Sequence, residues 1–106
     1  MLVERKGCIF DDAQLKKSHG YENLDPVAQE AFVNHIHLDG ANRDETAKNI
    51  IEEWVSEMKA KWPGSVFRIY QHREIDELTV RFHRHRPEFP DWSEGDEALS
   101  ITIVRT

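Results

Sequence analysis

Four histidines of the chain occur as two closely spaced pairs, His35-Ile36-His37 and His83-Arg84-His85. Imidazole serves both acid–base chemistry near neutral pH and metal binding. If the second pair lies on a strand, its two rings project from the same face about 7 Å apart along the chain, a spacing that metal sites use. Asp39 follows the first pair and offers a carboxylate ligand. The pairs therefore suggest a small metal-dependent or acid–base enzyme as one hypothesis.

Neighbouring cations weigh against a metal site at these histidines. Arg81, Arg84 and Arg86 are interleaved with the second pair and place positive charge beside any bound metal ion. The ligands of a metal site must also converge on one point, and no spacing in the sequence brings the two pairs together. Cys8 is the only cysteine, which excludes an internal disulfide and a cysteine-based zinc site within one chain. We predict no metal, with solvated histidines on a strand face.

The sequence motifs of the common enzyme classes are absent. The chain has no glycine-rich nucleotide-binding loop, no serine nucleophile elbow and no HExxH metalloprotease motif. We therefore predict no catalytic residue and no cofactor, and a protein that works by binding. An enzyme based on His35, His37, His83 and His85 stays open as the alternative.

Alternation along the predicted strands places basic side chains together on one face. In the strand predicted over 77–85, the apolar residues at even positions point inward, while Arg81, His83 and His85 point outward. Such a stripe can hold phosphate or an acidic protein loop, although arginine on an exposed face also serves solubility. A formal net charge of −6 weighs against binding to nucleic acid and modestly favours a basic protein partner.

The segment 86–97 carries the clearest features of a binding loop, with five carboxylates, two aromatic residues and two prolines. Prolines restrict a loop before binding, aromatic residues are enriched at interface hot spots, and carboxylates pair with a basic partner. In the competing interpretation, the aromatic side chains fold back over the core and the acidic residues face water. The predicted partner-binding residues are Glu88, Phe89, Asp91, Trp92, Glu94, Asp96, Glu97, Arg81, His83 and His85.

Two helices are predicted ahead of these residues. Asp25 followed by Pro26 is typical of a helix start and predicts a helix over 26–34, with Phe32 as its main buried anchor. A longer helix is predicted over 43–62, with Asn42 as N-cap in a capping box with Glu45. Its apolar residues recur at helical spacing and predict one buried face. They are Ala47, Ile51, Trp54, Met58 and Trp62.

Beyond Pro63-Gly64 the apolar period changes from 3.6 to 2, which predicts strands over 65–71, 77–85 and 98–105. The last strand is expected to bury Leu99, Ile101 and Ile103. The first twenty residues are ambiguous, with a short strand at 8–10 and one helical turn at 11–17. The expected fold class is α+β, an antiparallel sheet of three or four strands with two helices packed on one face and the other face in water.

Length and composition are typical of one small domain. The 106 residues allow a single hydrophobic core, so residues 1–106 are predicted to form one domain. No apolar run approaches the roughly 20 residues that cross a bilayer, and the first residues lack a secretory signal. A single cysteine fits a reducing compartment. We expect a cytoplasmic protein with no membrane contact, and a monomer is favoured.

In general character the chain resembles small bacterial immunity proteins, which neutralise a cognate toxin, often a basic nuclease, by covering it. Residues 77–83, running on to Asp91-Trp92, look like the strand and the acidic, aromatic segment found in some of them. The resemblance implies a tight one-to-one complex with a cognate toxin protein of basic charge, without catalysis or cofactor. A self-assembling adaptor or subunit stays open as a further class.

Overall fold

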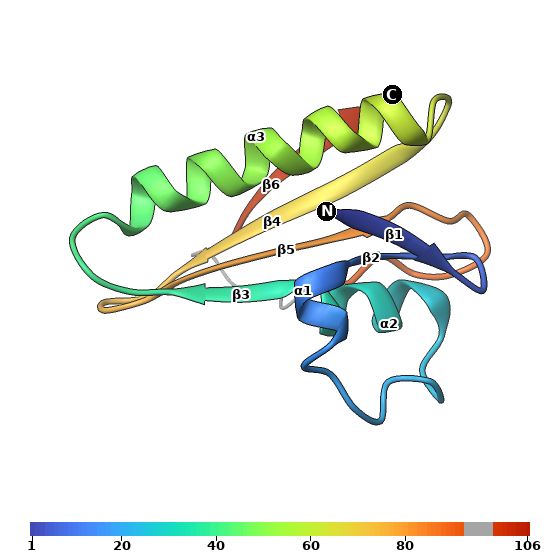
Figure 1. The fold of residues 1–106 in the computed structure, drawn as a ribbon, viewed down its shortest axis with the longest axis horizontal. Helices are drawn as coiled ribbons and strands as arrows, with labels where there is room; N and C mark the ends of the chain where they lie inside the picture. The colour runs from blue at the N-terminus through green and yellow to red at the C-terminus, as the bar shows by residue number, and fades with distance from the viewer. Residues whose placement is uncertain (93–98) are drawn as a thin grey trace.

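The computed structural model describes residues 1–92 and 99–106 as an α+β fold with two antiparallel sheets (Figure 1). The helices are α1 (Asp12–Leu15), α2 (Pro26–Val33) and α3 (Arg43–Lys61). The strands are β1 (Leu2–Arg5), β2 (Cys8–Asp11), β3 (His35–Leu38), β4 (Val66–Arg73), β5 (Leu78–Arg84) and β6 (Leu99–Arg105). β1 and β2 pair with each other, and the larger sheet has the order β3-β5-β4-β6. The predicted fold class is confirmed.

Helix α3 packs along one face of the larger sheet (Figure 1). Its buried residues are Ala47, Trp54 and Met58, as the helical spacing predicted. They share one core cluster with inward-facing residues of the sheet: Phe67, Ile69, Leu78, Val80, Phe82 and Val104. The predicted capping box is wrong, because the Asn42 backbone does not take the extended conformation of a side-chain N-cap and its side chain makes no capping hydrogen bond. No helix in the described part of the chain has the length and apolar composition that a bilayer crossing requires.

Trp54 links the helix to both sheets. Its ring packs edge to face on Phe82 with the centroids 4.7 Å apart, and its indole N–H donates to a carboxylate oxygen of Asp11 at 2.9 Å. Leu2 and Ile9 of the β1–β2 hairpin belong to the same core cluster. The hairpin is therefore part of the core, and the predicted short strand at 8–10 and the helical turn after it are confirmed as β2 and α1.

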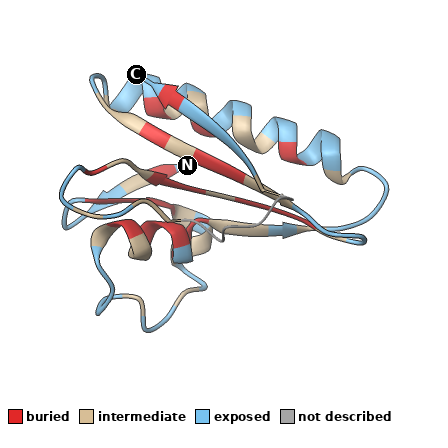
Figure 2. Cartoon of the chain, turned by 180° about the vertical axis from the view of Figure 1, so that it is seen from behind, coloured by how far each residue is buried: buried red, intermediate tan, exposed pale blue. Residues whose placement is uncertain are grey.

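The side chains of strand β6 face the opposite way from the prediction. The register pairs Val104 with Phe67 and Thr102 with Ile69, so the even-numbered positions of β6 face α3. Ile101 and Ile103 are 44% and 46% exposed, and their predicted burial is wrong for this reason. Figure 2 shows β6 exposed over most of its length, with one buried position near its end.

Helix α2 lies beside β5 where the pairing with β3 ends. β3 pairs with β5 only as far as Arg81, whose guanidinium donates to the Ala31 carbonyl of α2 at 3.0 Å. The buried residues of α2 are Val27, Glu30, Ala31 and Val33. Phe32 is 43% exposed, so its predicted role as the anchor is wrong. Val27 and Val33 of this helix point inward. Helix α2 does not lie with α3 over the apolar face of the larger sheet.

We call the face of the larger sheet opposite α3 the open face. The strand register places His35, Arg81, Tyr70 and Ile101 side by side across it. Alternation along the strands adds further residues to this face: His37, Thr79, His72, Leu99, His83, Arg68 and Ile103. Tyr70 and His83 are only 1% and 0% exposed. The expectation of a face wholly in water is therefore wrong, because the segment after β5 covers part of it.

Candidate functional site

The segment 86–92 folds back onto the open face and packs Trp92 between two strand residues. The Arg81 guanidinium carbon lies 4.0 Å from the centroid of the indole ring, and Tyr70 packs edge to face on it at 4.9 Å. Cation–π and edge-to-face contacts of this kind each stabilise by about 1 kcal/mol. Of the two interpretations of this loop, the structure therefore shows Trp92 packed against the sheet.

Asp91 fastens the same segment to β4 and to the end of β5. Its carboxylate accepts from His85 Nδ1 at 2.9 Å and lies 3.2 Å from Arg68 Nε. Burial alone would raise the pKa of Asp91, but the hydrogen bond from His85 and the positive charge of Arg68 outweigh it, so the pKa is lowered. Asp91 is therefore an ionised anchor that fixes the loop before any partner binds.

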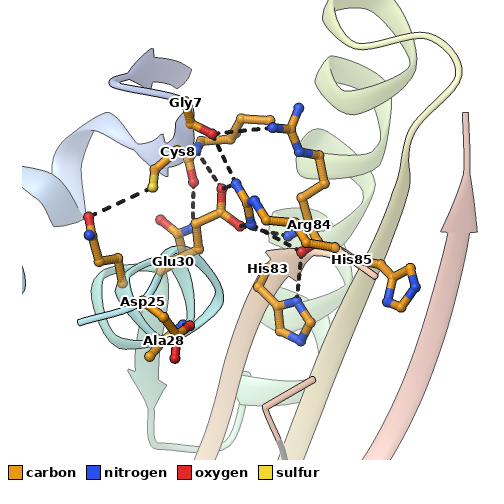
Figure 3. A network of polar contacts seen from close by, with 12 residues as sticks. Gly7, Cys8, Asp25, Ala28, Glu30, His83, Arg84 and His85 are labelled. Carbon is orange, nitrogen blue, oxygen red and sulfur yellow. Dashed lines mark hydrogen bonds and ion pairs between the residues drawn. The ribbon is translucent and has the colours of Figure 1, made fainter. Parts of the chain in front are cut away.

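His83 lies fully buried beneath this segment. The backbone N–H of Trp92 donates to its Nε2 at 3.3 Å, which leaves the proton on Nδ1. Nδ1 donates to the Arg84 carbonyl at 3.0 Å (Figure 3). The Tyr70 hydroxyl lies 2.9 Å from the same Nε2, and burial raises the pKa of Tyr70. Burial also lowers the pKa of His83. The imidazole is thus neutral and engaged at both nitrogens.

His83 should make the fold less stable in mild acid. Because its folded-state pKa lies below the usual 6.5, the unfolded chain binds a proton more readily, and stability falls as the pH drops below 6.5. His83→Gln removes this titration and should reduce the loss, by up to about 1.4 kcal/mol per pH unit. Urea unfolding of both proteins from pH 8 to pH 5 measures the difference. Burial also lowers the pKa of His35, but His35 is present in both proteins, so its contribution cancels in the difference between them. If the difference in the free energy of unfolding between the two proteins stays constant from pH 8 to pH 5, the lowered pKa of His83 is wrong.

The chemistry open to this cluster is limited by its packing. Tyr70, His83, Asp91 and His85 form a chain of titratable groups, but His83 is inaccessible and a substrate reaches it only if the segment 86–92 moves. The rings of His35 and His37 lie 4.9 Å apart on β3, and His37 binds Glu77 and Thr79. Within residues 1–92 and 99–106, no three histidine, cysteine or acidic side chains are grouped to hold a metal ion.

The structure brings five of the predicted partner-binding residues into one cluster. These are Arg81, His83, His85, Asp91 and Trp92, which contact one another or shared neighbours on the open face. Glu88 is exposed and Phe89 is partly buried in the turn between β5 and the Asp91 anchor. Glu94, Asp96 and Glu97 lie outside the described residues. The residues of the predicted loop are therefore divided between a packed part and an exposed turn.

A buried ion pair that the sequence did not indicate holds the start of this segment. Glu30 of α2 is 0% exposed, and both of its carboxylate oxygens accept from the Arg86 guanidinium at 2.8 Å. The same carboxylate accepts the backbone N–H groups of Ile9 at 2.6 Å and Arg84 at 2.8 Å (Figure 3). One side chain thereby joins β2 of the small sheet to β5 of the large one.

Further polar contacts complete this junction. Arg86 also donates to the Gly7 carbonyl at 2.9 Å, in the turn between β1 and β2. Asn34 accepts from the Asp11 N–H at 2.8 Å and donates to the Ile9 carbonyl at 2.9 Å, which satisfies the edge of β2. The available sequence signal for this ion pair was Glu30, a charged residue between Val27 and Ala31 on a short helix. It did not reveal the partner, which lies 56 positions further on.

Next to Asp91 the open face continues into the exposed side of β6. A small hollow of about 160 Å³ lies there, lined by Val66, Arg68, His85, Ile103 and Arg105. Comparisons with protein-family models, with curated proteins and with solved structures found no match for this chain. In this part of the open face, apolar and charged side chains are exposed together.

Proposed function

We propose that the chain is a non-catalytic binding protein that recognises a protein partner along β6 on the open face. The supporting observation is the exposure of Ile101 and Ile103 on an edge strand. No strand among the described residues pairs with the outer edge of β6. Branched apolar side chains beside unpaired backbone groups favour the addition of a strand from another protein.

The packed cluster beside β6 supports binding rather than catalysis. His83 is closed off from solvent with both ring nitrogens bonded, so its role in this proposal is to position the loop. Asp91 and Trp92 are held against the sheet in advance. A loop ordered before association loses less conformational entropy on binding, and this raises the affinity for a given contact area.

Within this class we propose an immunity protein that binds a cognate bacterial toxin in the cytoplasm and blocks its active site. The formal charge of −6 would speed encounter with a basic toxin, because the charge of the whole chain acts at long range. Glu88, exposed in the turn beside the Asp91 anchor, offers a carboxylate to such a partner. Local complementarity at the contact then sets orientation and specificity.

Capture and growth assays together test this role. The tagged chain should retain one basic protein in equal amount from a lysate of its source organism. That protein, expressed alone in a test strain, should arrest growth, and co-expression of this chain should restore it. A retained partner without toxicity would refute the immunity role. If the chain captures only copies of itself, self-assembly through the open β6 edge replaces the proposal.

A further inference from the structure

The hollow at the end of β6 collects positive charge beside apolar walls. Arg68 and Arg105 line it with His85, while Val66 and Ile103 supply its apolar surface. Arg105 is exposed and forms no ion pair with any residue in 1–92 or 99–106. None of the described residues that line the hollow is acidic, whereas the chain as a whole carries a formal charge of −6.

Asp91 shows which ligand chemistry these cations accept. Its carboxylate takes a hydrogen bond from His85 Nδ1 and lies 3.2 Å from Arg68 Nε. Asp91 thus pairs with Arg68, while Arg105 lines the hollow without an ion pair to any described residue. Guanidinium groups bind carboxylates through parallel, charge-assisted hydrogen bonds. Within the part of the chain that the structure describes, the hollow therefore has an unpaired positive charge at Arg105, and the neighbouring Arg68–Asp91 contact shows how a carboxylate pairs with such a charge.

We infer that this hollow binds an aspartate or glutamate side chain of the protein partner, on an extended segment that lies along β6. The inference rests on the proposed function, because it names the chemistry of the partner at one point of the same face. Val66 and Ile103 suit the methylene groups of an acidic side chain. Inorganic phosphate has no apolar part to place against these walls, so a carboxylate on a carbon chain is the better occupant.

An NMR titration of the isotopically labelled full chain tests the inference without the natural partner. The probe is an end-capped peptide of alternating valine and glutamate, compared with its glutamine twin and with inorganic phosphate. We expect the glutamate peptide to shift the signals of Arg68, Ile103 and Arg105 and to bind at least about tenfold more tightly than the twin. Phosphate should bind more weakly than the glutamate peptide.

A matched pair of variants locates the effect. Arg105→Gln, at an exposed position, should reduce binding of the glutamate peptide about tenfold, while Arg5→Gln, exposed on β1, should leave it unchanged. Equal binding of the two peptides, or an equal response of both variants, would overturn the inference. So would phosphate binding as tight as that of the glutamate peptide. If the Ile101 and Ile103 variants weaken binding of the natural partner but Arg105→Gln leaves its affinity unchanged, the carboxylate site is wrong while the proposed function stands.

Discussion

Glu30→Gln should lower the free energy of unfolding by about 3–5 kcal/mol, because it leaves the Arg86 guanidinium buried without its counter-ion. The substitution also weakens the acceptor for the backbone N–H groups of Ile9 and Arg84, which link the two sheets. Small domains are stable by only about 5–15 kcal/mol in total. Urea unfolding followed by circular dichroism measures the loss.

Two further proteins separate the ion pair from general effects of substitution. Glu53→Gln makes the same change at an exposed position of α3 and should alter stability by less than about 0.5 kcal/mol. Arg86→Gln alone should also be strongly destabilising, since it leaves the Glu30 carboxylate buried. The double variant Glu30→Gln with Arg86→Gln should lose less than the sum of the two single losses. Additive losses would show that the two side chains act independently.

Ile101→Glu combined with Ile103→Glu should weaken binding of the proposed protein partner at least about a hundredfold. Both side chains are exposed on the open face, and two buried carboxylates would replace apolar contacts at the centre of the interface. Most of the change should appear as faster dissociation. Surface plasmon resonance with the purified partner measures both rates.

Ile75→Glu is the matched control for this double variant. Ile75 is 91% exposed in the turn between β4 and β5, and it lies outside the strands that form the open face. A single Ile-to-Glu change there, half of the charge added in the double variant, should leave the affinity within about twofold of the wild type. If Ile75→Glu weakens binding as much as the β6 variant, added negative charge explains the result and β6 is not the contact.

The elements with long periodic patterns could be predicted from sequence. Helix α3 repeats its apolar residues over five turns, so Trp54 and Met58 were placed in the core correctly. β4 and β5 alternate clearly and are joined by a short turn, which requires an antiparallel pair. In such segments local pattern and tertiary packing favour the same arrangement.

Two elements, β6 and α2, were assigned the wrong buried face, and one short strand was missed. In β6 the alternating set Leu99, Ile101 and Ile103 is the more apolar one, yet the register with β4 turns Val104 to the core. Along α2, alanines and valines supply two possible faces, and contact with β2 and β5 selects the one with Val27 and Ala31. β3 was not predicted, because its four residues give too short a pattern.

The structure brings together residues that the sequence analysis had placed on two separate features. The strand residues Arg81, His83 and His85 and the loop residues Asp91 and Trp92 were predicted as two separate candidate surfaces, and their contacts with one another were not foreseen. Sequence spacing cannot show that a loop folds back on its own strand. The same limit hid the pair of Glu30 and Arg86, because long-range partners are fixed by the fold.

Hydrogen exchange with mass spectrometry, on the chain alone and in complex with its captured partner, tests the proposed binding surface most directly. We expect slower exchange of the backbone amides of β6 in the complex, since an added strand would pair with its open edge. The exposed face of α3 should exchange at the same rate in both states. Protection confined to α3, with β6 unchanged, would contradict the proposal that the partner binds along β6.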